Sequence, residues 1–432
     1  MAQTNSATFL RWHDQWMSRS GCERTLQVRW LLDANRLPQE NVEITELRGR
    51  IVRIRSLSDA EHSQILPWIL IPPLANLHTH LEFSTLENPL RPAQPFTAWI
   101  QSVMEWRRQN TSPRAAVQKG LQESISAGVS LIGDISTDDS RTSLTDLIHP
   151  LQGLSQIRRE LANAETTHVS FREAIGLTPE RMAAQLTSAE QYLAETSPPM
   201  TQGCRTLRGL SPHAPYTVHP DLLSSLVRLA AENQVPVAMH LAETPDEIEL
   251  LTKGTGRFQV FLDRLGLFDS RTFPGGRSIR EHLEVLAMAP RSLVIHGNYL
   301  TAEDIACLAQ HPQMTVVFCP RTHRWFGHRP YPLEQLLQAG VRVALGTDSR
   351  ASNPDLDIWK EFQLVLEQFP GIPVESVLSM ATRNAYDALN LQSESRGFTE
   401  GAEFFALPVE FQSEGTSLRQ LLREERTHPI GL

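Results

Sequence analysis

Short hydrophobic runs recur along this chain, and the segments between them change in character. From about residue 26 to residue 70, the runs LQVRWLL, NVEITEL, RIVRI and WILIPPL are separated only by turns, which is typical of strands. The segment RGFTEGAEFFALPVEF near the other end has the same character. We therefore predict a small β-module built from both chain ends, with residues 1–70 supplying its first strands and residues 393–432 returning to it.

Between residues 71 and 392, short apolar runs alternate with amphipathic helical segments. Five of the predicted strands are the most distinct, at 129–135, 235–240, 293–296, 315–318 and 341–345. Repeated strand–helix units favour a parallel sheet, and about eight such units fit this span, as in a (β/α)8 barrel. The sequence has no glycine-rich phosphate loop that would favour an open nucleotide-binding sheet. We therefore predict an α/β fold with a (β/α)8 barrel at residues 71–392.

The most informative polar residues lie at the ends of predicted strands. They are His78 and His80 in NLHTHLE, His240 in VAMHLAE, His296 in VIHGN and Asp348 in ALGTDS. Barrel strands converge at their carboxyl ends, and side chains two positions apart on a strand point the same way. Taken alone, a His-x-His pair is more often two surface or satisfied histidines, and the other residues have the alternative explanation of a satisfied core side chain or a helix cap. Together they predict a site for one divalent metal ion, with Zn²⁺ favoured and Fe²⁺ as the alternative.

Two further observations bear on the predicted metal chemistry. Glu243 follows His240 closely, at the expected mouth of the barrel. It is either a proton shuttle beside the metal or a helix N-terminal charge worth about 0.3–1 kcal/mol. The chain has three lysines, Lys119, Lys253 and Lys360, and all fall in predicted helical segments. Two-metal barrels usually need a bridging lysine at a strand end, so a single metal ion is favoured.

Composition narrows the class of protein. The 432 residues are 41% hydrophobic and 21% charged, which is ordinary for a soluble globular protein. A net charge of −9 does not indicate the positively charged surface that nucleic-acid-binding proteins present. No apolar run approaches the ~20 residues of a membrane span, and the N-terminus lacks the apolar region of a secretory leader. The four cysteines are scattered, so we predict a cytoplasmic location with no nucleic-acid or membrane partner.

The strand-end motifs together resemble the amidohydrolase superfamily, in its branch of chlorohydrolases and aromatic deaminases. The matching segments, in chain order, are PPLANLHTHLEFS, GLSPHAPYTV, AMHLAET, LVIHGN, CPRTHRWFG and VALGTDSRASNPDLDIWKE. The segments HTHLEFS, FTAWI and LGTDSRASNPDLD are most similar to those of aminodeoxyfutalosine deaminase-type proteins, followed by those of S-adenosylhomocysteine/methylthioadenosine deaminase-type proteins. The resemblance implies a distorted (β/α)8 TIM-like barrel with a small β-sandwich formed from both chain ends, and a homodimer.

The resemblance also implies roles for individual residues. It makes four residues the metal ligands, namely His78, His80, His240 and Asp348. Glu243 becomes the acid/base group, His296 hydrogen-bonds the attacking hydroxide, and Asp348 orients that hydroxide and accepts its second proton. His213 in SPHAPY and Glu82 after HTHL become substrate contacts.

Further substrate contacts are candidates on weaker grounds. Arg172 in SFREAIG could anchor a polar substrate tail, and Trp325 could stack on a heterocycle or simply pack in a loop. His323 stands where the family often has an asparagine lining the mouth, and Arg350 replaces a residue that is often small or apolar. These two departures leave the metal centre intact but bear on the identity of the substrate.

The sequence thus predicts a hydrolase acting on a small molecule. The favoured reaction replaces an exocyclic amino group of a nitrogen heterocycle by a carbonyl and releases ammonia, with an adenine-type nucleoside such as aminodeoxyfutalosine as substrate. One alternative is a dechlorinase or cyclic-amide hydrolase with the same metal centre. Another, of a different class, is a catalytically silent barrel that acts as a binding or scaffold protein.

Overall fold

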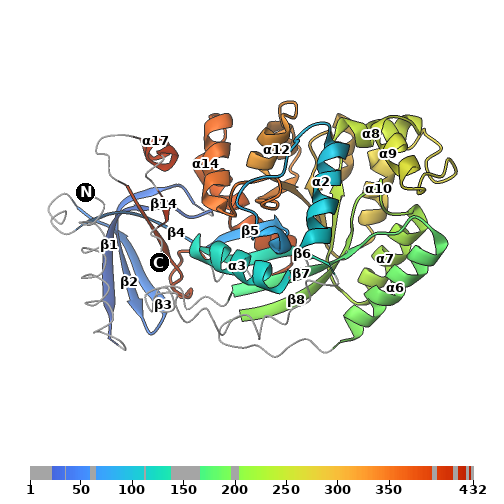
Figure 1. The fold of residues 1–432 in the computed structure, drawn as a ribbon. Coiled ribbons are helices and arrows are strands. Elements are labelled where there is room, and N and C mark those ends of the chain that lie inside the picture. The colour runs from blue at the N-terminus through green and yellow to red at the C-terminus, as the bar shows by residue number, and fades with distance from the viewer. Residues whose placement is uncertain are drawn as a thin grey trace.

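The computed structural model describes residues 22–34, 36–58, 65–110, 113–137, 166–195, 204–391, 397–411, 417–424 and 428–429. Eight strands form its larger sheet and are paired in chain order; the first four of them are labelled in Figure 1. They are β5 (Leu74–Thr79), β6 (Val129–Ser136), β7 (Thr166–Ala174), β8 (Cys204–Pro212), β9 (Val237–Leu241), β10 (Ser292–His296), β11 (Met314–Phe318) and β12 (Arg342–Leu345). Neighbouring strands are parallel throughout. The predicted α/β barrel is confirmed.

Hydrogen bonds between the first strand and the loop after the last one bring the two ends of the sheet together. The amide of Asp348 donates to the carbonyl oxygen of His78 at 3.0 Å. The amide of Thr347 donates to Asn76 Oδ1, and Asn76 Nδ2 donates back to Thr347 Oγ1 at 2.8 Å. These bonds make the barrel nearly closed, so the carboxyl ends of β5 and β12 lie beside each other.

The barrel interior is apolar below this rim. Leu293 and Ile295 of β10 belong to a buried cluster inside the barrel, whereas Val294 between them packs in the layer that separates strands from helices. Helix α16 (Arg383–Ala388) covers the amino-terminal end, where the Tyr386 hydroxyl lies 2.8 Å from Ser130 Oγ. A packed interior closed at one end leaves the carboxyl ends of the strands as the place for polar chemistry.

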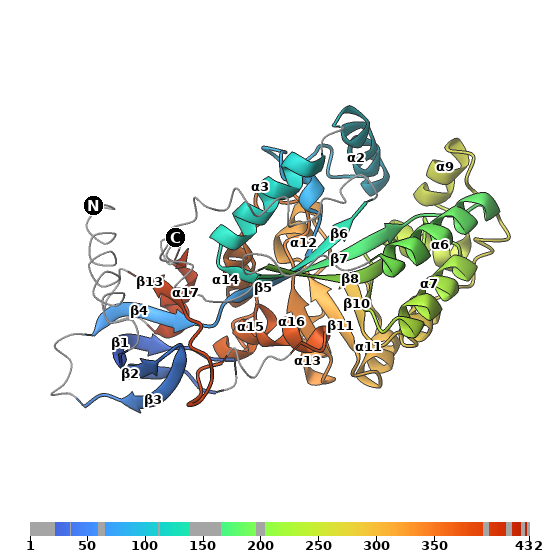
Figure 2. The same cartoon turned by 90° about the horizontal axis from the view of Figure 1, so that it is seen from below.

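Helices surround the barrel (Figure 2). The described helices between the barrel strands are η2 (Leu81–Phe83), α2 (Phe96–Gln109), α3 (Pro113–Ser126), α6 (Pro179–Ala194), α7 (Pro220–Glu232), α8 (Pro245–Lys253), α9 (Arg257–Arg264), α10 (Ile279–Leu286), α11 (Ala302–Ala309), α12 (Pro320–Phe326) and α13 (Leu333–Gln338). The described helices after β12 are α14 (Ile358–Gln368), α15 (Val374–Met380), α16 and α17 (Leu418–Arg423). None of the helices in the described ranges is long and apolar enough to cross a bilayer.

A smaller sheet draws on both ends of the chain, as predicted. Its strands are β1 (Arg24–Leu31), β2 (Gln39–Leu47), β3 (Arg50–Ser56), β4 (Leu66–Ile71), β13 (Leu407–Glu410) and β14 (His428–Pro429). The sheet order β14-β13-β4-β1-β2-β3 places the C-terminal strand β13 antiparallel to β4 (Figure 2). The predicted absence of a leader concerns residues 1–20, which lie outside the described residues, as do parts of 393–432.

Candidate metal centre and active site

The candidate site lies at the carboxyl ends of β5, β9, β10 and β12. Three residues there adopt left-handed backbone conformations although none of them is glycine. The φ angles are +53° at Ala242, +69° at His296 and +58° at Asp348. Such conformations are costly for residues with a Cβ and recur at functional sites. Strand alternation from Ile295 would send the His296 side chain outward, so its left-handed turn is what directs it into the site.

Three histidines and one aspartate converge there. Asp348 Oδ1 lies 3.5 Å from His78 Nε2 and 3.8 Å from His80 Nε2. The Nε2 atoms of His80 and His240 are 3.3 Å apart. In the groups His78–His80–Asp348 and His78–His240–His296, all ligand atoms lie within 4.8 Å of one another, and all these residues are buried. The side chains that were predicted as metal ligands are therefore brought together.

The hydrogen bonding of these histidines fits a metal ion. Both ring nitrogens of His78 and Nδ1 of His80 are buried without a hydrogen-bond partner among the described residues. His240 Nδ1 donates to the carbonyl oxygen of His213 at 2.9 Å, so its Nε2 presents a lone pair to the cluster. Burial lowers the pKa of His80 to about 3, which keeps that imidazole neutral. Neutral imidazoles and a carboxylate are the donors that zinc or iron(II) accepts.

Glu243 lies at the edge of this cluster. Its Oε1 is 3.5 Å from His296 Nε2, and the side chain is buried. The amides of Ala242 and Glu243 both donate to the Glu247 carboxylate at 2.8 Å, which fixes the turn that presents Glu243. Burial, with Asp348 and Glu247 nearby, raises the pKa of Glu243 well above its ordinary value, and a hydrogen bond from Tyr216 opposes this. A carboxyl group with a raised pKa can hold and release a proton near neutral pH.

A cavity of about 300 Å³ opens from the cluster. His80, His240, Glu243, His296 and Asp348 line its inner end. Apolar side chains of two helices form much of the outer wall: Ile100, Val103 and Met104 from α2, and Phe261 and Leu262 from α9. Such an enclosure suits a small organic molecule whose polar end meets the metal centre.

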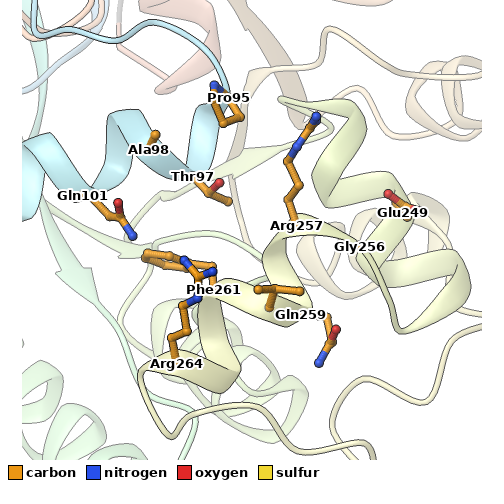
Figure 3. A pocket seen from close by; sticks show the side chains of 11 residues that line it. Pro95, Thr97, Ala98, Gln101, Glu249, Gly256, Arg257, Gln259, Phe261 and Arg264 are labelled. Carbon is orange, nitrogen blue, oxygen red and sulfur yellow. The ribbon is translucent and has the colours of Figure 1, made fainter.

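Helices α2 and α9 face each other across the outer wall. On their solvent side they line a separate surface pocket, in which Thr97 and Gln101 of α2 lie opposite Phe261 and Arg264 of α9 (Figure 3). Phe261 lines both hollows. This ring therefore separates the inner cavity from the surface pocket.

The predicted substrate contacts divide into two groups. His213 is in the cavity wall, with its ring 4.9 Å from that of His240. Glu82 is buried and does not line the cavity, but it pairs with Arg107, whose Nε lies 3.1 Å from Glu82 Oε1 and which does line it. Glu82 thus acts on the cavity only through Arg107.

Arg172, His323 and Trp325 are not brought to the cavity, so this arrangement does not make them substrate contacts. Arg172 is buried on the outer side of β7, where its Nη2 donates to Ser188 Oγ of α6 at 3.0 Å. His323 packs edge-on to Phe318, and Trp325 lies under the Arg91 guanidinium, 4.2 Å from its carbon. Each of these three side chains packs against neighbouring parts of the fold and does not reach the candidate metal centre.

Arg350 also lies outside the cavity lining. Its Nε donates to the Leu86 carbonyl oxygen at 2.7 Å, and its Nη1 lies 2.8 Å from Glu123 Oε1 of α3. The residue ties the loop after β12 to α3. These contacts give a structural reason for an arginine at a position where the family often has a small or apolar residue.

The sequence analysis missed Glu173, Arg107 and Tyr216, which all line the cavity. One signal for Glu173 was present: Val169 and Phe171 point into the barrel, and the alternation of β7 continues to Glu173 rather than to Arg172. Burial alone would raise the pKa of Glu173, but Arg107 and neighbouring histidines hold it below its ordinary value. Glu173 is therefore a carboxylate at neutral pH.

Comparison with known proteins gives an independent view of the same chain. Residues 69–411 match the family described as the Amidohydrolase family. A 5-methylthioadenosine/S-adenosylhomocysteine deaminase from Pyrococcus furiosus is 29% identical over 338 residues, 75% of this chain and 71% of that protein. An aminodeoxyfutalosine deaminase from Deinococcus radiodurans is 27% identical over 324 residues, 73% of this chain and 72% of that protein.

A solved structure gives a comparison at the level of the fold. The Helicobacter pylori aminofutalosine deaminase in complex with methylthio-coformycin superposes with a TM-score of 0.69 at 18% sequence identity. The match covers 94% of this chain and 97% of that one. At this identity the likeness concerns the arrangement of strands and helices.

Proposed function

This chain belongs to the amidohydrolase family, and from that membership we propose that it is a metal-dependent hydrolytic deaminase of an adenine-type nucleoside. The reaction replaces the exocyclic amino group of the base by a carbonyl group and releases ammonia. Both sequence relatives described above are named as deaminases. Among nucleosides of this type, we favour aminodeoxyfutalosine, because the sequence motifs of this chain are most similar to those of aminodeoxyfutalosine deaminase-type proteins.

One observation carries this proposal. His78, His80, His240 and Asp348 converge within a few ångströms of one another, and Glu243 lies beside them at the inner end of an enclosed cavity. The orphaned ring nitrogens of His78 are hard to explain in a scaffold protein, because buried polar atoms without partners are costly. A bound cation would satisfy Nε2, the ring nitrogen that faces Asp348. The arrangement therefore supports an enzyme over a silent barrel.

Each residue of the cluster has a proposed role. His78, His80, His240 and Asp348 hold one divalent ion, and this donor set fits zinc best. When bound, such an ion supplies Lewis-acid activation of the attacking water. Glu243 takes a proton from that water and delivers it to a ring nitrogen of the base, which makes the adjacent carbon electrophilic. His296 hydrogen-bonds the oxygen that adds to this carbon. Asp348 accepts the second proton and passes it to the exocyclic nitrogen, so the carbon–nitrogen bond breaks and ammonia leaves as the carbonyl forms.

The environment of Glu243 suits that role. Burial raises the pKa of Glu243, so the carboxyl group retains the proton that it accepts until the ring nitrogen takes it. Tyr216, in contact with the same carboxyl group, is itself buried in the cavity wall. Exclusion of water from such a site strengthens each of these interactions.

The first experiment is an assay of ammonia release by the zinc-loaded protein. The panel is aminodeoxyfutalosine, methylthioadenosine, S-adenosylhomocysteine, adenosine, guanine, cytosine and a chloro-s-triazine. We expect ammonia from one adenine nucleoside with kcat/KM of roughly 10⁴ M⁻¹s⁻¹ or above. Chloride release from the triazine without any ammonia release would replace the deaminase proposal by the dechlorinase alternative.

Three finer points stay predictions from the sequence. We propose zinc rather than iron(II) as the resident ion, a cytoplasmic location and a homodimer. Metal analysis of the purified protein, fractionation of cells and sedimentation analysis test them in turn.

A further inference from the structure

One buried carboxylate at the cavity wall has no part in the proposed reaction. Glu173, at the end of β7, is 7% exposed and lines the cavity. Its Oε1 is buried and has no hydrogen-bond partner among the described residues. Arg107 Nη1 pairs with Oε2 at 3.6 Å, which is too long for a hydrogen bond. A buried carboxylate oxygen without a donor is unfavourable, so a bound molecule that brings a donor here is favoured.

His213 supplies a second acceptor beside Glu173. Its Nδ1 lies 2.7 Å from Thr217 Oγ1, and the Thr217 hydroxyl donates its own proton to the Ala214 carbonyl oxygen at 3.1 Å. Nδ1 therefore carries the imidazole proton, and Nε2 presents a lone pair. His213 Nε2 lies 3.9 Å from Glu173 Oε1. The two acceptors thus lie side by side in the cavity wall.

The charge around this pair selects the kind of group that it receives. Arg107 is shared between Glu82 and Glu173 and pairs with Glu173 through Oε2, so Glu173 Oε1 is a carboxylate oxygen without a close cation. A carboxylate or phosphate of a ligand would be repelled. An ammonium group would have to lose its water in a cavity with a largely apolar wall, which is costly. Uncharged hydroxyl groups can donate to both acceptors at little cost.

We propose that Glu173 and His213 bind the hydroxyl groups of a neutral sugar in the substrate, such as the vicinal diol of a ribonucleoside. This inference rests on the proposed function, because it assigns the sugar of the same substrate whose base meets the metal centre. Arg107 and Glu82 act as positioning residues that hold the Glu173 carboxylate. The enzyme then distinguishes ribonucleosides from their deoxy analogues.

Binding experiments test this inference without relying on turnover. The protein is zinc-loaded and carries Glu243→Gln, so that bound nucleosides persist. Isothermal titration compares adenosine with 2′-deoxyadenosine and 3′-deoxyadenosine. We expect at least one deoxy analogue to bind roughly 10–100-fold more weakly than adenosine, as for loss of a hydrogen bond to a charged group. Adding Glu173→Gln should weaken adenosine binding and reduce the preference for adenosine to within about threefold.

A matched control and three possible outcomes decide whether Glu173 and His213 bind the sugar. Glu105→Gln removes an exposed carboxylate from α2 and should preserve the preference for adenosine. Equal binding of adenosine and both deoxy analogues, with deamination by the wild type intact, overturns this inference and leaves the proposed function standing. A preference that survives Glu173→Gln unchanged also overturns it. Absence of both binding and deamination for every adenine nucleoside overturns the proposed function and this inference together.

Discussion

Glu243 Oε1 and His296 Nε2 lie 3.5 Å apart at the inner end of the cavity, and both side chains are more than nine-tenths buried. The two residues follow different strands, β9 and β10, and each depends on a left-handed residue, Ala242 or His296 itself. The proposed proton donor and the proposed oxygen-binding group are thereby held next to the proposed metal ligands. At this separation both atoms can contact the same reacting group when it lies beside them.

Replacing Glu243 by glutamine should abolish proton transfer without removing the metal site. We expect kcat to fall by about 10²–10⁴-fold or more, the usual contribution of a general acid–base group. Ammonia release measures the loss, and mass spectrometry of the folded protein should find unchanged metal content. Glu284→Gln, on the exposed face of α10, is the control and should retain full activity. Near-normal turnover by Glu243→Gln would rule out the assigned role.

Removal of the metal should lower the thermal stability. Neither buried ring nitrogen of His78 has a protein partner among the described residues, and the proposed ion would satisfy Nε2. Binding at a concentration of 1,000 times Kd stabilises a fold by about 4 kcal/mol. Differential scanning calorimetry after chelation should therefore show a Tm several degrees lower, and zinc should restore it. A Tm that does not respond to chelation or to added zinc would contradict the metal assignment.

The stability should fall as the pH rises through the range in which Glu361 titrates. Burial raises the pKa of this α14 carboxyl group from 4.5 to about 8, although Arg321 opposes the shift. The folded state then binds a proton that the unfolded state has lost, so stability decreases between pH 4.5 and 8. Glu361→Gln should flatten this part of the Tm-against-pH curve. The exposed Glu367→Gln on the same helix should leave the curve as it is in the wild type.

Arg107→Met should destabilise the fold and make stability more sensitive to pH. The change leaves Glu82 and Glu173 buried together without their cation, which raises the folded-state pKa of both. Stability should therefore be lost as pH rises from about 5 to 8 and recover on acidification. Because a third of the Arg107 side chain is exposed, we expect less than the roughly 3–5 kcal/mol typical of breaking a fully buried pair.

Denaturant unfolding at pH 5 and pH 8 measures this loss. Arg108→Met is the matched control, since Arg108 on the same helix is exposed. Adding Glu82→Gln to Arg107→Met should recover part of the stability at pH 8. Equal destabilisation at both pH values would show that packing, rather than charge, is what Arg107 contributes.

Much of the barrel could be predicted because its chemistry follows strand periodicity. His240 ends a short apolar strand whose alternate residues face the interior, and its direction follows from that pattern. His296 follows the opposite parity, and the sequence alone does not show the left-handed turn that reverses it. Position at a strand end was sufficient to choose His296, but not to explain how it reaches the site.

The substrate side of the cavity was harder to predict. Arg172 was chosen over Glu173 by residue type, although the alternation of β7 favours Glu173. Arg107 lies on α2, in a segment whose orientation depends on packing against Phe83 of η2 and against α9. Arg107 is not at a strand end, and its pairing with Glu173 joins segments far apart in the chain. Such contacts follow from tertiary packing, which local patterns do not encode.

His213 has two structural roles, and together they limit how the substrate specificity of this enzyme can change during evolution. Its carbonyl oxygen accepts from both the amide and Nδ1 of His240, while its ring lies in the cavity wall. Because the His213 ring also packs against the ring of His240, 4.9 Å away, a substitution at His213 that altered substrate choice would also change the packing of a proposed metal ligand. Glu173 has no contact of that kind with the ligands. New specificities should consequently arise first at Glu173 and along α2, with His213 among the last positions to change.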